Sequence, residues 1–325
     1  MYDTTKPYKK TISELIKKTR ETPYVSVIDN IVYKKFNFPE CHHSDGIGTK
    51  GVYHWQNRSF ENAVIDSMAM NLNDLALMRA KPYAVIDHLL LPEDDKEAIV
   101  DLISSLSSEC VKRNIAITGG ETAIHNNIEG LEISMTMLGF IENPKPNKFR
   151  KGDYLIGIES NGLHSNGFTK VRELFGDEFR EEFIRPTYIY LDEILELNKN
   201  YDIHGMMHIT GGAYTKLIDL LDDCDALITN EYALEPQEIF FELYDEGVSV
   251  SDFEMYKTFN CGVGFILGVS KKDADDVIMS IKNFRAEQIG EVFRGSNKVK
   301  IKSKFSNEKV VYEAEDYKLS IQNES

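Results

Sequence analysis

The spacing of apolar residues along the chain predicts a series of alternating helices and strands. In the first half, apolar residues recur every three or four positions in stretches that predict helices at 9–20, 59–79 and 94–113. Stretches rich in β-branched, aromatic and aliphatic residues predict strands at 24–33, 83–91, 114–118 and 131–141. The first half is therefore predicted to be an α/β unit.

The second half shows the same alternation. Strands are predicted at 154–158, 226–229, 262–269, 287–292, 298–302 and 310–313, and helices at 168–175, 188–197, 213–221, 236–245 and 272–283. Between the halves, residues 143–152 are rich in Pro and Lys, which is typical of a domain boundary. The sequence therefore predicts an α/β (mixed α+β) chain of two domains, an N-terminal domain at 1–145 and a C-terminal α/β domain at 146–325.

Length and charge narrow the possible functions. A chain of 325 residues is long enough for two domains with large cores. The 37 Lys and Arg against 53 Asp and Glu give a net charge of −16, which disfavours nucleic acid and anionic membranes as partners. No apolar run resembles a signal peptide or a membrane span. We therefore expect a cytoplasmic protein that binds neither nucleic acid nor membrane.

The cysteines support the same location. Cys41, Cys110, Cys224 and Cys261 are far apart and form no C-x-x-C pair. This spacing argues against a disulfide framework and against a zinc knuckle. A reducing compartment is therefore expected.

Residues 44–50, SDGIGTK, concentrate groups that suit a metal-bound phosphate: a carboxylate, two glycines, a hydroxyl and an ammonium. The overlapping GIGTKG matches G-x-G-x-x-G, but that fingerprint requires an apolar strand before it and an amphipathic helix after it. The flanking sequences CHH (41–43) and GVYHWQ (51–56) do not fit that context, and the Walker A spacing is absent. We therefore expect phosphate chemistry here without a Rossmann dinucleotide site.

Acidic residues beside the predicted strands indicate a magnesium site. Asp45, Asp74 and Glu121 lie just after or beside these strands. Magnesium takes about six oxygens, usually one or two carboxylates with the phosphates that it bridges, so a nucleoside triphosphate fits. Asp74 lies between two leucines, which makes a solvated helix face the less favoured alternative. Lys50 is either a phosphate contact or an ordinary exposed lysine.

Glycine-containing turns ahead of predicted helices are candidates for phosphate binding. Gly211-Gly212 and residues 162–167 offer backbone N–H groups at the positive end of a helix dipole. A plain turn that begins a helix explains a single Gly-Gly pair at least equally well. Both interpretations stay open at this point.

The histidines do not form a convincing zinc site. His204 and His208 have the i, i+4 spacing of a zinc-binding helix, but no glutamate lies between them. His42 and His43 are adjacent, and neighbouring side chains of a strand point to opposite faces. A zinc protease is therefore not expected.

Seven short blocks, in chain order, together resemble the phosphoribosylformylglycinamidine cyclo-ligase (aminoimidazole ribonucleotide synthetase) family. They are SDGIGTK (44–50), MNLNDL (70–75), GGETA (119–123), GLHSNG (162–167), PTYIY (186–190), HGMMHITGG (204–212) and MYKTFNCGVG (255–264). The resemblance covers about residues 44–292. It is carried by the set of blocks in the right order rather than by any one of them.

The resemblance implies a fold and a reaction. The N-terminal domain would pair with that of a second copy in a barrel-like homodimer core, and the C-terminal domain would close over the nucleotide. Members of the family use ATP to phosphorylate the formyl amide oxygen of formylglycinamidine ribonucleotide. The amidine nitrogen then attacks the activated carbon, and phosphate leaves as the imidazole ring forms. ATP and Mg²⁺ are the implied cofactors, with a small ribonucleotide as substrate.

The resemblance also implies roles for the matching residues. The implied magnesium ligands are Asp45, Asp74 and Glu121. The implied ATP site contains Asp45, Gly46, Gly48, Thr49, Lys50, Asn73, Asp74, Gly119, Gly120, Glu121 and Thr122. Substrate or transferred phosphate would be held by His164, Ser165, Asn166, Thr210, Gly211 and Gly212. The catalytic set would be Asp45, Lys50 for phosphate neutralisation, Asp74, and His208, which suits proton transfer because histidine titrates near neutral pH.

Two departures from the family pattern keep alternatives open. Members usually begin with a Tyr-Lys-Asp-Ala-Gly-Val-Asp segment and carry a glycine-rich, Phe-containing loop before DG-x-GTK, whereas this chain has different sequences at 4–10 and 25–35. The family's GGETAEMP becomes GGETAIHN at 119–126. The alternatives are a non-catalytic nucleotide-binding paralogue or a related small-molecule kinase similar to thiamine monophosphate kinase or selenophosphate synthetase. Retention of the three acidic residues together with Lys50 favours the enzyme.

Overall fold

The computed structural model describes residues 8–176, 178–246 and 250–314. The chain divides into two compact units, one made of Met1–Pro144 with Phe179–Leu191 and the other of Lys145–Glu178 with Asp192–Ser325. Their first junction lies within the Pro- and Lys-rich stretch at 143–152. The division made from the sequence did not include the return of Phe179–Leu191 to the first unit. The chain therefore passes between the units three times.

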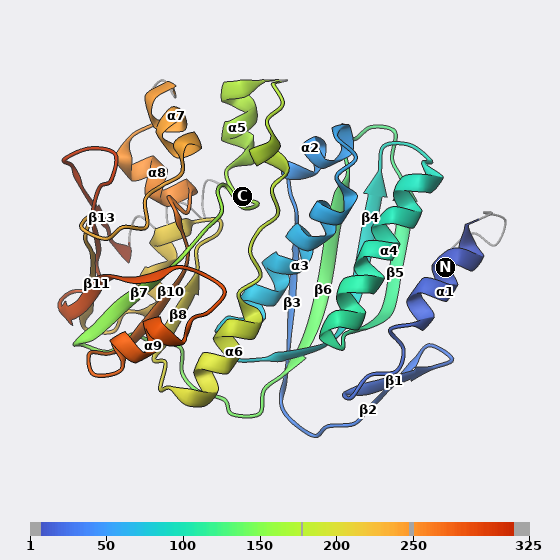
Figure 1. The fold of residues 1–325 in the computed structure, drawn as a ribbon, viewed down its shortest axis with the longest axis horizontal. Helices are drawn as coiled ribbons and strands as arrows, with labels where there is room; N and C mark the ends of the chain where they lie inside the picture. The colour runs from blue at the N-terminus through green and yellow to red at the C-terminus, as the bar shows by residue number, and fades with distance from the viewer. Residues whose placement is uncertain (1–7, 177, 247–249, 315–325) are drawn as a thin grey trace. The chain divides into compact units, whose positions relative to one another are not determined.

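A four-stranded sheet in the order β3-β6-β4-β5 forms the centre of the first unit (Figure 1). The strands are β3 (Glu40–Gly46), β4 (Lys81–Leu91), β5 (Ala116–Ile124) and β6 (Glu132–Phe140). β4 and β5 run parallel, while β6 is antiparallel to both β3 and β4. Helix α3 (Phe60–Leu77) packs on β3 and β6, and α4 (Lys96–Arg113) packs on β5, so the two helices cover one face of the sheet.

The core of the first unit lies between this sheet and its two helices. Leu72 and Leu75 of α3 and Leu102 and Ile103 of α4 are fully buried, as the helical spacing of apolar residues predicts. The remaining elements of the unit are α1 (Lys9–Lys17), β1 (Val25–Ile28), β2 (Ile31–Lys34), α2 (Lys50–Gln56) and the 3₁₀ helix η1 (Glu181–Ile184). The predicted α/β character of the first half is confirmed.

The single strand predicted at 24–33 was wrong, because β1 and β2 form an antiparallel hairpin there. Asp29 and Asn30 lie between them with φ values of 51° and 65°. Two consecutive residues in this left-handed region make the turn that suits the twist of a tight hairpin. The Asp-Asn pair was the sequence signal for this turn.

The strand and helix that flank SDGIGTK correct one argument made from the sequence. β3 ends at Gly46 and α2 begins at Lys50, so a strand does precede the motif and a helix does follow it. However, β3 pairs with β6 in the antiparallel direction. A dinucleotide-binding unit requires parallel strands joined by the helix. A Rossmann site is therefore excluded by topology rather than by local context.

β5 is longer than the strand predicted at 114–118. Asn114 has a left-handed backbone (φ 59°) that ends α4, and β5 then continues from Ala116 to Ile124. The GGET residues, 119–122, therefore lie inside a strand instead of in a loop after it.

The second unit contains a seven-stranded mixed sheet in the order β13-β12-β9-β11-β7-β10-β8. β12 and β9 are parallel, and the other neighbouring pairs are antiparallel. The strands are β7 (Asp153–Glu159), β8 (Gly205–His208), β9 (Cys224–Ile228), β10 (Val263–Ser270), β11 (Ala286–Arg294), β12 (Val299–Lys302) and β13 (Lys309–Tyr312). The helices that begin in this part of the chain are α5 (Phe168–Phe175), α6 (Leu191–Asn200), η2 (Ala213–Leu220), α7 (Glu238–Glu246), α8 (Asp252–Thr258) and α9 (Ala274–Ser280).

Two predicted helices of the second half differ from the structure. The helix predicted at 188–197 begins only at Leu191, because residues 185–190 are extended. Pro186 disfavours helical backbone in the residue before it, which helps to keep this run out of the helix. The helix predicted at 213–221 is the 3₁₀ helix η2.

Candidate functional site

His43 and Asn71 connect the two elements that carry two of the three predicted magnesium ligands. Asp45 lies on β3, and Asp74 lies on α3. His43 Nε2 lies 3.1 Å from Asp74 Oδ2, and His43 Nδ1 lies 3.1 Å from Asn71 Oδ1. Asn71 Nδ2 donates to the backbone oxygen of Asp45 at 3.1 Å. The Asp45 carboxylate accepts a hydrogen bond from the backbone N–H of Gly46 at 2.7 Å. The end of β3 and the middle of α3 are thus connected through polar side chains.

The orientation of Asn71 determines the charge of His43. Because Asn71 Nδ2 also donates to the Ser67 carbonyl at 2.9 Å, Asn71 Oδ1 is the acceptor for His43 Nδ1–H. Nε2 donates to the Asp74 carboxylate when it carries a second proton, which makes His43 an imidazolium. Its hydrogen bond to Asp74 raises the pKa of His43, although partial burial opposes the change. The negative charge of Asp74 is therefore partly neutralised.

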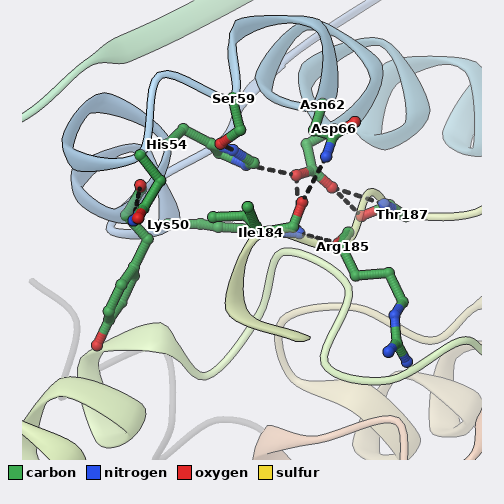
Figure 2. A network of polar contacts seen from close by, with 10 residues as sticks. Lys50, His54, Ser59, Asn62, Asp66, Ile184, Arg185 and Thr187 are labelled. Atoms are coloured by element: carbon green, nitrogen blue, oxygen red, sulfur yellow. Dashed lines mark hydrogen bonds and ion pairs between the residues drawn. The ribbon is translucent and has the colours of Figure 1, made fainter. Parts of the chain in front are cut away.

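Lys50 lies in a buried polar network (Figure 2). Its side chain is fully buried, and its Nζ lies 2.7 Å from Asp66 Oδ2 and donates to the Arg185 carbonyl at 2.6 Å. His54 Nε2 donates to the same Asp66 oxygen at 2.8 Å, and His54 Nδ1 accepts from the Ser59 hydroxyl at 2.8 Å. The interpretation of Lys50 as an ordinary exposed lysine was therefore wrong.

The charges of this network follow from its contacts. Burial alone would raise the pKa of Asp66, but the Lys50 ammonium and the His54 ring outweigh it and hold that pKa below its ordinary value. Burial lowers the pKa of His54, against the pull of Asp66, which keeps the imidazole neutral. The network thus contains an ion pair between Lys50 and Asp66.

Asn73, which the resemblance assigns to ATP, binds the protein backbone. It is fully buried. Its Nδ2 donates to the Tyr188 carbonyl at 2.9 Å, and its Oδ1 accepts from the Tyr190 N–H at 2.7 Å. Its contact with ATP stays a prediction.

The GGET residues lie opposite β4 in the parallel register. Gly120 pairs with Asp87 and Glu121 with His88. Because neighbouring strand residues point to opposite faces, Gly120 and Thr122 face the helices and Glu121 faces the other side of the sheet. The Glu121 carboxylate accepts from the Thr122 N–H at 3.0 Å. The predicted ATP residues Gly46, Gly48 and Thr49 lie at the end of β3 and in the turn before α2, and Gly119 lies on β5.

Asp87 is a buried carboxylate that the sequence did not single out. It is 2% exposed, and neither of its carboxylate oxygens has a hydrogen-bond partner within the described residues. The buried hydroxyl of Thr122 likewise has no partner there. Burial raises the pKa of Asp87 to about 7, and the nearby Glu121 carboxylate adds to the rise. Asp87 therefore differs from the paired acidic residues of this unit.

The first unit supplies part of the oxygen ligands that a magnesium ion requires. Within the described residues, no group of three or more His, Cys, Asp or Glu side chains is placed to share a metal ion. Magnesium usually takes one or two carboxylates and completes its shell with phosphate oxygens and water. Asp45 and Asp74 supply hard oxygen donors in that number. They fit a magnesium ion that arrives with a nucleotide, without a complete protein cage.

In the second unit, Asn260 of the MYKTFNCGVG block connects segments that are far apart in the sequence. Its Nδ2 donates to the Gly162 carbonyl at 2.8 Å, and its Oδ1 accepts from the Ser160 hydroxyl at 2.7 Å and from the Gly262 N–H at 3.0 Å. The Tyr214 hydroxyl donates to the Asn260 carbonyl at 2.9 Å. The GLHSNG turn and η2 are therefore held by one asparagine.

The predicted phosphate-binding residues lie in two adjoining turns of this unit. A Cβ placed on Gly211 would lie 3.6 Å from Asn166 Oδ1, so the turn at 164–167 is next to Gly211. The Nδ2 atom of Asn166 is buried and has no hydrogen-bond partner among the residues described. Lys216 Nζ donates to Thr210 Oγ1 at 2.6 Å, which brings an ammonium to the same place. Backbone N–H groups, an amide donor and a cation together suit a phosphate.

The histidines of the second unit are buried. His164 lies in the first turn with φ 58°, and its Nε2 accepts from the Asn161 N–H at 3.4 Å; Ser165 follows it and is partly exposed. His208 is fully buried on β8 and stacks with Phe265. Because β8 is a strand, the helical zinc spacing of His204 and His208 does not exist in the fold. Proton transfer by His208 stays a prediction.

Several residues that matter here were missed from the sequence. Asn62 and Asp66 lie at i and i+4 of α3 and bind the segment at 184–190 together with Asn73, which was predicted only as an ATP residue. A polar stripe on a helix whose other residues are mostly apolar was an available signal. Asp87 and Lys216 gave no such signal, because neither belongs to a spaced pattern.

Comparison with known proteins places both units in one family. Residues 39–141 match the N-terminal domain model, and residues 150–302 the C-terminal domain model, of the AIR synthase related proteins. Phosphoribosylformylglycinamidine cyclo-ligase of Saccharolobus solfataricus is 34% identical over 275 residues, which cover 82% of each chain. The enzyme of the same name from Clostridium novyi is 35% identical over 277 residues, which cover 80% of this chain and 83% of the relative.

Solved structures show the same fold at low identity. The hydrogenase maturation protein HypE in complex with ATP superimposes with a TM-score of 0.68 at 13% identity, over 96% of this chain and 95% of that one. Thiamine-monophosphate kinase from Stenotrophomonas maltophilia gives a TM-score of 0.63 at 15% identity, over 93% of this chain and 98% of that one. In the described part of the chain, no helix combines the length and apolar character that crossing a membrane requires. The predicted family is confirmed, and the chain belongs to the phosphoribosylformylglycinamidine cyclo-ligase family within the AIR synthase related proteins.

Proposed function

We propose that the protein converts formylglycinamidine ribonucleotide into aminoimidazole ribonucleotide, a ring closure of purine synthesis that consumes ATP and releases ADP and phosphate. The observation that carries the proposal is the 33–35% identity to relatives named phosphoribosylformylglycinamidine cyclo-ligase. That identity covers at least 80% of this chain and of each of these relatives, so it includes both units. The family's two-domain organisation supports the same reaction.

The reaction needs ATP because an amide oxygen is a poor leaving group. Transfer of the terminal phosphoryl group to the formyl amide oxygen makes the carbon electrophilic, and the amidine nitrogen then attacks it. The former amide oxygen departs with the phosphate. The protein's contribution to such a transfer is mainly placement and neutralisation of charge.

The residues of the first unit would hold the nucleotide. Asp45 and Asp74 would bind magnesium with the ATP phosphates. Glu121 lies on the opposite face of the sheet from α3, so its contact with the nucleotide stays a prediction apart from this pair. Bound magnesium neutralises phosphate charge and orients the phosphoryl group. The buried Nδ2 of Asn166, the Gly211-Gly212 turn and Lys216 of the second unit would bind the substrate or the transferred phosphate. His208 stays a candidate for proton transfer.

We also propose that the protein acts as a homodimer in the cytoplasm. Ile86 lies in the middle of β4 on the sheet face opposite α3 and α4, and it is 44% exposed. An apolar side chain at the centre of a sheet face favours burial against a second copy. The four free cysteines favour a reducing compartment. Light scattering would test the dimer, and Ile86→Lys would be expected to yield monomers.

The decisive assay follows both products. The protein is mixed with ATP, Mg²⁺ and formylglycinamidine ribonucleotide, and ADP and aminoimidazole ribonucleotide are measured together. Equal amounts of the two products are expected. ADP without the imidazole product would point to the alternative of a related kinase. Nucleotide binding without any turnover would instead point to a non-catalytic paralogue.

A further inference from the structure

A segment of the first unit, residues 184–190, runs from the last residue of η1 into an extended chain and is held along α2 and α3 by side chains; it is here called the strap. These side chains bind mainly backbone atoms of the strap, and Asp66 also accepts from the Thr187 hydroxyl. The contacts are Asn62 Nδ2 to Ile184 O (3.0 Å), Lys50 Nζ to Arg185 O (2.6 Å), Thr187 N to Asp66 Oδ1 (2.7 Å), Asn73 Nδ2 to Tyr188 O (2.9 Å) and Tyr190 N to Asn73 Oδ1 (2.7 Å).

The strap and the helix match in length. Asn62 and Asn73 are eleven residues apart in α3, which corresponds to roughly 17 Å of helix. The backbone groups that they bind, at Ile184 and Tyr190, are six residues apart in an extended chain, which spans roughly 20 Å. The strap therefore runs along the helix with little slack.

Asp66 is the central anchor of the strap. Its Oδ1 accepts from both the N–H (2.7 Å) and the hydroxyl (2.6 Å) of Thr187, while its Oδ2 receives Lys50 (2.7 Å) and His54 (2.8 Å). A carboxylate has about four acceptor positions, so Asp66 has none left for another donor. Figure 2 shows Lys50 and His54 on one side of Asp66 and Thr187 on the other, with the side chain of Arg185 pointing away.

Lys50 is committed to this arrangement. Its side chain is fully buried between the Asp66 carboxylate and the Arg185 carbonyl. Moving the ammonium to a phosphate would leave the Asp66 carboxylate buried without its cation, which is costly. The buried charge of Asp66 therefore disfavours any movement of the Lys50 ammonium toward a phosphate.

The strap contacts the two segments that carry the candidate magnesium ligands. Lys50 begins α2, directly after the loop that follows β3, the strand that carries Asp45, and Asn73 immediately precedes Asp74 on α3. A segment bound at both places constrains the separation of the two carboxylates. Both constraints lie within the first unit.

We propose that Lys50 and Asp66 are positioning residues, which hold the strap on α3 and thereby fix Asp45 and Asp74 for magnesium and nucleotide, and that Lys50 does not itself contact phosphate. This inference rests on the proposed function for its effect on turnover. The claim that Lys50 and Asp66 hold the strap on α3 does not depend on the reaction.

The test uses paired substitutions that separate the two roles of Lys50. Lys50→Met leaves Asp66 without its cation, and Asp66→Asn turns an amide donor toward Lys50. In the double variant Lys50→Met/Asp66→Asn, the amide oxygen still accepts from Thr187, and His54 in its other tautomer accepts from the amide. Both buried charges are then absent, which is far milder than breaking the pair. Lys81→Met, which removes a partly exposed ion pair with Glu142 on the same unit, is the matched control.

Two measurements are made on each full-length variant: hydrogen exchange at the Thr187 and Tyr190 amides, and calorimetric binding of magnesium with a non-hydrolysable ATP analogue. Each single variant is expected to exchange about tenfold faster at both amides, because the strap opens locally. Each is also expected to bind the analogue about tenfold more weakly. The double variant is expected to recover both properties, while the control resembles the wild type.

Two results would overturn the proposal. One is unchanged exchange at both amides in Lys50→Met and Asp66→Asn, since the ion pair would then not hold the strap. The other is a double variant that keeps a protected strap but binds the analogue as weakly as Lys50→Met, which would make Lys50 a phosphate contact. Failure of the proposed function is a separate outcome, because a wild-type protein that closes no ring still reports strap exchange and nucleotide binding.

Discussion

Asp87 on β4 and Gly120 on β5 lie directly opposite each other, and the Asp87 carboxylate fills the space that a side chain at position 120 would need. A Cβ placed on Gly120 would lie 2.4 Å from Asp87 Oδ1. At the neighbouring Gly119, the nearest atom to a Cβ would be 3.7 Å away, in the side chain of Ile86. An alanine at the second glycine of GGET would therefore have to displace the Asp87 carboxylate.

Gly120→Ala is expected to destabilise the first unit by about 1–3 kcal/mol, because the methyl group overlaps the buried carboxylate. Gly119→Ala is the matched control and should cost clearly less, since its Cβ meets only ordinary contacts. The single tryptophan, Trp55, lies in α2 of the first unit, so its fluorescence during urea unfolding reports this unit. Equal destabilisation by the two substitutions would show that the carboxylate moves aside.

Asp87→Asn is expected to stabilise the protein at pH 8 and to have little effect near pH 4. The folded pKa of about 7 lies above the ordinary value of 3.8, so the stability contributed by protonated Asp87 is complete below about pH 4 and is lost as pH rises to 7. The difference between the folded and the ordinary pKa of Asp87 corresponds to about 4 kcal/mol of unfolding free energy as an upper estimate. The difference in unfolding free energy between variant and wild type should therefore grow with pH.

A control separates this effect from a general change in charge. Asp101 lies on the exposed side of α4, and Asp101→Asn should give the same small difference from wild type at both pH values. If Asp87→Asn also gives a constant difference, the Asp87 carboxylate is ionised throughout and has a partner outside the described residues.

Asp74→Asn is expected to reduce turnover by about 100-fold or more, because a neutral amide is a poor magnesium ligand. Asp74 is partly exposed, so the unfolding monitored at Trp55 should change little. The magnesium concentration needed for half-maximal rate should rise as well. Full activity at ordinary magnesium would remove Asp74 from the metal site.

Lys216→Met is expected to weaken binding of the phosphorylated substrate by roughly tenfold or more, the usual value of a hydrogen bond to a charged group. The methionine removes the ammonium that lies on Thr210 Oγ1 but keeps most of the chain beside Gly212. KM for the ribonucleotide should rise more than kcat falls. Lys170→Met on α5 removes an exposed ion pair with Glu173 and serves as the control; an equal effect of both would indicate general loss of surface charge.

The sequence predicted the alternation of elements, the first boundary and the family, because apolar spacing and motif order are local properties. It could not predict which polar side chains would turn inward. Lys50 was assigned to phosphate as part of the GTK motif, but its partner Asp66 is contributed by α3. The contact of Lys50 with the Arg185 carbonyl spans 135 residues of chain. Such pairings are set by the packing of elements.

Packing between distant elements also explains why the helix predicted at 188–197 begins later in the structure, at Leu191. Local apolar residues favoured a helix there, while the buried amide of Asn73 draws Tyr188 and Tyr190 into an extended conformation. Asp87 was overlooked because its unusual character comes from burial and from the lack of a hydrogen-bond partner among the described residues. Neither quantity can be read from neighbouring residues.

The return of Phe179–Leu191 to the first unit has a consequence for the order of synthesis. When the ribosome has made only the residues up to Pro144, the sheet and helices of that unit are complete in sequence, yet Lys50, Asp66 and Asn73 have no strap to bind. These polar side chains can bind the strap only after the ribosome has also made α5 of the second unit, which precedes the strap in the sequence. The two units are therefore interleaved during biosynthesis, and a fragment that ends at Pro144 would lack the backbone groups that Lys50, Asn62, Asp66 and Asn73 bind in the complete unit.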